Sequence, residues 1–127
     1  MKIKKSSVDY TTTNDPLNIS VGFGINEHCI SNFNLDNEFK YANDNGSMVY
    51  LGSGNDLKGH TVKVVSLVNN IKGEKITKEG DPNKGKYRVH INILLSDGKK
   101  TLKVLPYEEF VDNEPEMVQF VNSIKIK

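Results

Sequence analysis

Apolar residues occupy every second position in two long stretches of the chain. One stretch runs from Leu17 to Ile25, with small or polar residues between the apolar ones, and the other, the more regular, runs from Tyr87 to Leu95. A period of two places all apolar side chains of a strand on one face. Both stretches are therefore predicted to be β-strands with one buried face, and we expect Ile91 and Ile93 to lie in the core of a central strand.

Shorter stretches indicate further strands. Phe39 and Tyr41 alternate with Glu38 and Lys40, and an apolar run, 48–51, follows the turn signal Asn43-Asp44-Asn45-Gly46. Asn and Gly tolerate positive φ, so residues 38–51 are predicted to be a hairpin. Thr61–Asn69 is rich in β-branched residues and carries apolar side chains on both faces, which is typical of a central strand. Residues 71–78 suggest a weak edge strand whose lysines discourage pairing with other chains.

The C-terminal third contains one more hairpin and one ambiguous segment. Ser96-Asp97-Gly98-Lys99 is a turn signal, and Leu102 and Val104 begin a return strand that Pro106 is expected to end. Residues 107–116 are acidic and predicted to be irregular. The last segment, 117–126, fits a helix or a strand, and its β-branched residues favour the strand.

Seven to eight short strands separated by turn signals, without a convincing helix, predict an all-β fold, most simply an antiparallel β-sandwich, with a small barrel as second choice. The 127 residues are enough for one domain. We expect this domain to comprise residues 17–127, preceded by a polar N-terminal arm over residues 1–16 that is loose or docks on a partner.

Charge and cysteine content narrow the possible partners and compartment. The net charge is +1 and Arg88 is the only arginine, so neither nucleic acid nor a membrane surface is an expected partner. Cys29 is the only cysteine, which excludes an intramolecular disulfide. The start of the chain lacks the apolar region of a signal peptide. These features, with the Lys-, Asn- and Ile-rich composition of an AT-rich genome, lead us to expect a cytoplasmic bacterial protein.

No set of residues matches a known catalytic, cofactor or metal site. The Gly54–Thr61 segment approaches the phosphate-binding loop pattern, but His60 replaces its lysine and a strand is expected to follow. His28 and Cys29 are adjacent and would point apart in an extended chain, so they do not form a nucleophile–base pair. The Asn/Asp turns at Asp44 and Asp81 lack the full spacing of a calcium loop. We therefore expect no enzyme, no cofactor and no metal.

The acidic segment near the C-terminus is the candidate contact surface for a protein partner. Its aromatic residues would anchor a partner, while its acids would speed association with a basic surface. The predicted partner-binding residues are Tyr107, Glu108, Glu109, Phe110, Asp112, Glu114 and Glu116. The sequence thus favours a non-enzymatic module that binds a protein or builds an assembly. The alternative is a barrel or sandwich that holds a small apolar ligand, which requires an internal cavity.

Overall fold

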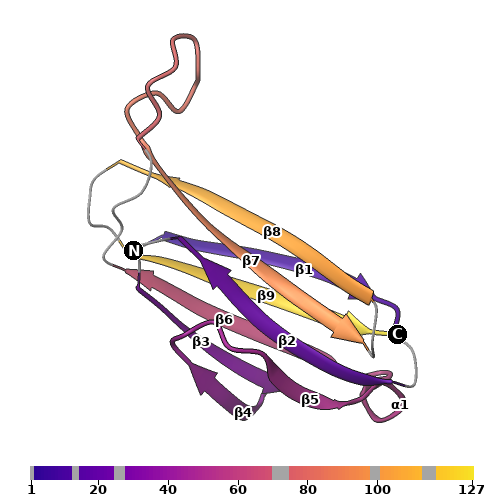
Figure 1. Ribbon diagram of the computed structural model, residues 1–127. Helices are drawn as coiled ribbons and strands as arrows, with labels where there is room; N and C mark the ends of the chain where they lie inside the picture. The colour runs from indigo at the N-terminus through magenta and orange to yellow at the C-terminus, as the bar shows by residue number, and fades with distance from the viewer. Residues whose placement is uncertain (1, 13–14, 25–27, 70–74, 98–100, 113–116) are drawn as a thin grey trace.

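The chain forms two β-sheets that pack face to face, as the computed structural model shows (Figure 1). It describes residues 2–12, 15–24, 28–69, 75–97, 101–112 and 117–127. The five-stranded sheet contains, in spatial order, β1 (Lys2–Tyr10), β9 (Val118–Ile126), β6 (Thr61–Asn69), β3 (His28–Leu35) and β4 (Glu38–Asn43). The four-stranded sheet contains β5 (Val49–Ser53), β2 (Pro16–Phe23), β7 (Tyr87–Asp97) and β8 (Thr101–Val111). The predicted all-β sandwich is confirmed, and the sheets do not close into a barrel.

Alternating side chains from both sheets build the core between them. Ile91 and Ile93 of β7 are fully buried, and β7 lies between β2 and β8 as a central strand, as predicted. In the other sheet, Val62, Val64 and Val68 of the central strand β6 are buried. The C-terminal segment is a strand, β9, which confirms the choice of strand over helix there.

The first strand corrects the expected N-terminal arm. Lys2–Tyr10 forms β1, which pairs in parallel with β9 along its whole length, while the other strand pairs are antiparallel. Lys2, Ser6 and Val8 of this strand are half-buried, although only one of these three is apolar. Ser6 donates a hydrogen bond to Asn122 Oδ1 inside the sandwich, and Tyr10 is buried. An edge strand has only one pairing partner, so a largely polar sequence with several lysines can form it.

The predicted hairpin over residues 38–51 does not form. β4 pairs with β3, and β5 pairs with β2 in the opposite sheet, so the connection between them crosses from one layer to the other. Within that connection Ser47 N donates to Asn45 Oδ1, and Gly46 has a φ of 72°. The predicted turn is present, but a turn signal does not specify which strand becomes the partner.

The segment 107–111 is regular and belongs to β8, contrary to the predicted irregular region. Pro106 does not end the strand because β8 is the edge of its sheet, where a missing backbone N–H has no strand to bond. The β7–β8 hairpin continues from Asp97↔Thr101 to Tyr87↔Val111.

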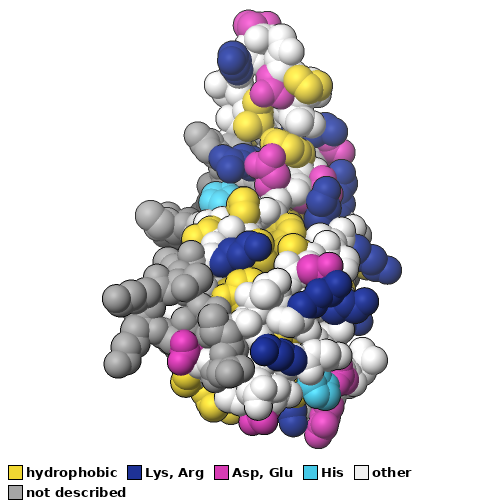
Figure 2. All heavy atoms as spheres, turned by 90° about the vertical axis from the view of Figure 1, so that its right-hand side faces the viewer, with side chains coloured by type: hydrophobic (Ala, Val, Ile, Leu, Met, Phe, Trp, Pro, Cys, Tyr) yellow, Lys and Arg dark blue, Asp and Glu magenta, His cyan; other side chains and the backbone are white. Residues whose placement is uncertain are grey.

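A narrow finger, residues 75–86, projects beyond the sandwich between β6 and β7 (Figures 1 and 2). Ile76 N donates to Lys86 O at 2.9 Å, and Gly85 N donates to Ile76 O at 2.8 Å. Lys75 forms only an isolated bridge to Tyr87. The described residues 75–78 therefore do not form the predicted edge strand, and its first part, 71–74, lies outside the described residues.

Candidate functional site: the outer face of the five-stranded sheet

The outer face of the five-stranded sheet divides into an apolar half and a polar half. Outward residues alternate with the buried ones on β3, β6 and β9, and the pairing register aligns them in rows across the sheet. In an antiparallel sheet with one buried face, the outer face is ordinarily polar. The apolar half departs from that pattern.

The apolar half contains what we call the apolar band: Ile3, Ile30, Val65, Leu67 and Val121. Two polar residues lie within this half, Gln119 between Leu67 and Ile3, and Asn32 opposite Val65. Ile30 lies directly opposite Leu67, and Val65 lies directly opposite Val121. Val65 and Leu67 are two residues apart on β6, so the four side chains adjoin one another on one face. Ile30 is 46% exposed and Ile3 is 52% exposed. A contiguous, solvent-facing apolar surface of this kind is typical of a contact site.

The polar half contains a row of hydrogen-bonding side chains that crosses the sheet. Asn34 lies opposite Lys63, Lys63 lies opposite Ser123, and Ser123 lies opposite Ser7. Phe39 of β4 lies opposite Asn34 and is 59% exposed. We call Asn34, Lys63, Ser123 and Ser7 the polar row, which therefore begins beside an aromatic ring.

A hollow of about 300 Å³ lies over one part of the polar half. It is lined by Asp36, Asn37, Thr61, Lys63 and Ser123. The turn between β3 and β4 places Asp36 and Asn37 there with φ values of 48° and 69°, which Asp and Asn tolerate better than most residues.

Asp36 is fixed by two hydrogen bonds at the edge of this hollow. Its Oδ2 contacts His60 Nδ1, and its Oδ1 accepts a hydrogen bond from Thr61 N at 2.9 Å. The hydrogen bond with His60 and then the one from Thr61 N lower the pKa of Asp36 from its ordinary value of 3.8. The hollow is therefore lined by one acidic side chain, Asp36, and one basic side chain, Lys63.

The predicted partner-binding residues do not form one free acidic surface. Glu108 Oε2 lies 2.8 Å from Arg88 Nε, and Asp112 Oδ1 lies 3.8 Å from Lys86 Nζ. Glu109 Oε1 accepts a hydrogen bond from the next backbone N–H along the chain. Two of the acids are thus paired with bases of the same chain, and Glu114 and Glu116 lie outside the described residues.

The two aromatic residues of that segment differ in orientation. Tyr107 lies opposite the buried Ile91 and packs against the core, whereas Phe110 lies opposite Arg88 and is half-buried. Tyr107 and Glu108 also line a hollow of about 280 Å³ together with Arg88, His90, Asn92 and Pro106. Binding of a partner at this segment stays a prediction.

The other sequence candidates occupy structural positions. Cys29 is buried, with its Sγ 3.7 Å from Ser31 Oγ, while His28 is exposed. Asp81 Oδ1 accepts a hydrogen bond from Asn83 N within the finger, as a turn requires. The described residues contain no group of three or more His, Cys, Asp or Glu side chains that could hold a metal ion.

The glycine-rich segment after β5 forms a helix of one turn. This helix, α1 (Gly54–Leu57), is capped by Ser53, whose Oγ accepts a hydrogen bond from Asp56 N at 3.2 Å, and β6 follows shortly after it. It buries Leu57 at the end of the sandwich.

The sequence carried a signal for the apolar band that was interpreted only as strand burial. Val65 and Leu67 are the apolar residues on the second face of Thr61–Asn69, and apolar side chains on both faces predict the central position that β6 occupies. The same pattern marks an outward apolar surface when no further layer covers that face. The polar row was not found, because its members come from four strands and align only in the folded sheet.

The fold places this chain in the class of all-β sandwiches with two packed sheets. No family model matches the chain, and no curated protein or solved structure matches it. Among the described residues, no helix has the length and apolar character needed to cross a membrane.

Proposed function

We propose that this protein is a non-enzymatic protein-binding or assembly module that uses the apolar band as its contact surface. The observation that carries the proposal is the row-by-row continuity of Ile30, Leu67, Val65 and Val121 on a sheet face that the described chain leaves open. Interfaces combine such an apolar centre with a polar rim.

The rim of the band indicates the chemistry of the partner. Lys5 lies beside Val121, and Lys63 lies two residues before Val65 on the same face. Neither lysine forms an ion pair within the part of the chain that is described. A partner surface with an apolar centre and acidic residues at its edge would complement both features.

The packing between the sheets supports a partner rather than an enclosed apolar ligand. The inward side chains of both sheets form one cluster of buried residues. A third hollow, of about 260 Å³, is lined by Ile30, Ala42, Asn43 and Asp44. None of the residues that line it or the two hollows at Lys63 and Tyr107 is fully buried.

The proposal is tested with Ile30→Lys and with Val104→Lys as its matched control. The two parent side chains are 46% and 47% exposed, but Val104 lies on the edge strand of the other sheet. Self-association is measured by sedimentation equilibrium of the pure protein, and partner capture is measured with the immobilised protein and an extract of its own cells.

We expect Ile30→Lys to weaken the association tenfold or more, because it places a charge in the apolar centre, while Val104→Lys leaves it unchanged. If neither self-association nor a captured partner is found for the parent protein, or if both variants behave as the parent does, the proposal is wrong.

A further inference from the structure

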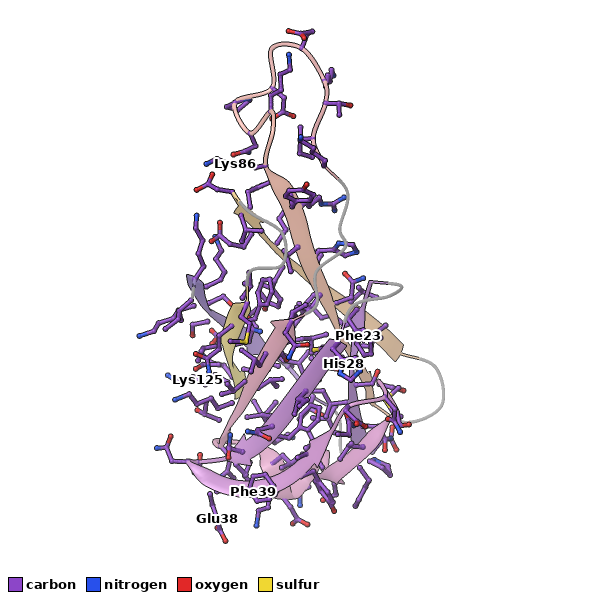
Figure 3. The ribbon with its side chains drawn as sticks, turned by 90° about the vertical axis from the view of Figure 1, so that its left-hand side faces the viewer. Phe23, His28, Glu38, Phe39, Lys86 and Lys125 are labelled. Atoms are coloured by element: carbon purple, nitrogen blue, oxygen red, sulfur yellow. The ribbon has the colours of Figure 1, made fainter. Side chains whose placement is uncertain are left out.

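The polar half of the same sheet has the features of a second binding site, which shares only Lys63 with the rim of the proposed protein contact. We propose that the polar row and the hollow beside it bind a neutral oligosaccharide, with the Phe39 ring as a stacking platform at one end. Figure 3 shows Phe39 and Glu38 at the end of the molecule away from Lys86 at the base of the finger.

The donors and acceptors of the site suit a ligand rich in hydroxyl groups. Asn34 and Asn37 each offer an amide that both donates and accepts, and the hydroxyl groups of Thr61, Ser123 and Ser7 do the same. Each sugar hydroxyl is also both a donor and an acceptor, so it can use such a mixed set fully.

The charges of the hollow favour a neutral ligand over an ion. Lys63 and Asp36 line it together, so an anion would meet the carboxylate and a cation would meet the ammonium group. Asp36 is already hydrogen-bonded to His60 and to the Thr61 backbone, but each carboxylate oxygen retains a lone pair for a sugar hydroxyl.

The aromatic ring and the length of the row favour an oligosaccharide over a single sugar. Phe39 is 59% exposed and shares its row with Asn34, so its ring can meet the C–H face of a sugar whose hydroxyls reach the neighbouring amide. From Phe39 to Ser7 the row crosses five strands, which at the usual strand spacing is about 19 Å. That distance corresponds to a short chain of sugar rings.

The test is affinity electrophoresis of the full chain in gels that contain neutral polysaccharides. The probes are a β-glucan, a xylan, a mannan and an α-glucan, with the anionic polysaccharides pectate and heparin in parallel. A glycan that retards the protein is then followed by calorimetric titration with its hexasaccharide. We expect retardation by at least one neutral polysaccharide and none by the anionic ones.

Two substitutions test whether the glycan binds to this face of the sheet. Phe39→Ala and Lys63→Ala should each weaken hexasaccharide binding tenfold or more, because one removes the stacking ring and the other removes the central donor. The controls are Tyr50→Ala, an aromatic on the other sheet that is 53% exposed, and Lys78→Ala in the finger, and both should bind as the parent does.

Ser123→Ala provides a second, conservative variant in case Lys63→Ala disturbs the sheet, and it should weaken binding without changing the thermal midpoint. No retardation by any neutral probe, retardation by the anionic probes only, or unchanged binding by Phe39→Ala and Ser123→Ala would overturn the proposal. None of these results bears on Ile30→Lys, so the two proposals fail independently.

Discussion

Truncation of Ile91 to alanine tests whether the core is built as described. Ile91 is 0% exposed at the centre of β7, where it lies opposite Phe23 of β2 and Tyr107 of β8. The change removes three buried carbons, and at about 0.8 kcal/mol for each the transfer loss is about 2.4 kcal/mol. A neighbouring strand on each side limits relaxation, so a cavity remains, and the total should be about 3–4 kcal/mol, within the range of about 2–5 kcal/mol for such truncations.

The assay is urea unfolding followed by far-UV circular dichroism, with the same slope fitted for parent and variant. For a slope of about 2 kcal/mol per molar urea, a loss of about 3 kcal/mol lowers the midpoint by about 1.5 M. Ile3→Ala is the control, because Ile3 is 52% exposed on the edge strand β1 and should change stability by no more than about 0.5 kcal/mol. A loss below about 0.5 kcal/mol for Ile91→Ala would refute the central position of β7.

Three further changes test other parts of the structure. Cys29→Ser should leave association and glycan binding intact, because Cys29 faces the core, and should lower the unfolding free energy by about 1–2 kcal/mol in urea melts. Loss of all function with the fold intact would contradict the proposal of a non-enzymatic protein. Gly46→Ala should lower the unfolding free energy by about 1–2 kcal/mol, because Gly46 has a φ of 72° and an added Cβ would lie 3.2 Å from Val21 O. Gly22→Ala, whose Cβ would meet only ordinary contacts, should lower it less. Equal losses for the two variants would contradict this explanation. Because the pKa of Asp36 is lowered in the fold, its ionised form stabilises the fold at pH values above the unfolded pKa of 3.8, and this contribution is lost as the pH falls through the lower folded pKa. NMR titration of the carboxyl group should show a midpoint below pH 3.8 that rises in His60→Ala. A titration midpoint that is the same in this variant would exclude His60 as the main cause of the lowered pKa.

The period of two located most strands because it reports burial on one face, a property of single strands. It identified β2, β6 and β7 with little ambiguity, since each has three or more buried residues in strict alternation. It missed β1, whose half-buried positions include Lys2 and Ser6, because an edge strand is held mainly by backbone pairing with its neighbour.

Pairing between strands was predicted less well, because it depends on contacts far apart in the sequence. The turn at Asn43–Gly46 suggested a hairpin, yet β4 and β5 belong to different sheets. Only the overlap of apolar faces in three dimensions decides that β5 pairs with β2. Pro106 was misjudged for a related reason, since its effect depends on whether its strand lies at the centre or the edge of a sheet.

The candidate surfaces also differ in whether neighbouring residues of the sequence, or residues far apart in it, form them. The acidic residues near the C-terminus are prominent in the sequence because they lie within nine residues of one another, but two of them are paired in the fold with Arg88 and Lys86. The members of the apolar band come from four strands, and Ile3 and Val121 are separated by almost the whole chain. A surface of that kind can be found only once the register is known.

The two halves of this sheet face differ in what their side chains gain on folding, and this bears on their function. The polar row costs little when exposed, because water satisfies its amides and hydroxyls in the absence of a ligand. The outward apolar residues of β6 gain nothing from exposure, and polar residues would serve equally well in the strand. Val65 and Leu67 are therefore the stronger evidence for a contact surface, and Leu67→Thr should keep the unfolding free energy within about 1 kcal/mol of the parent while weakening association. If Leu67→Thr associates as strongly as the parent protein does, the apolar band is not the contact surface.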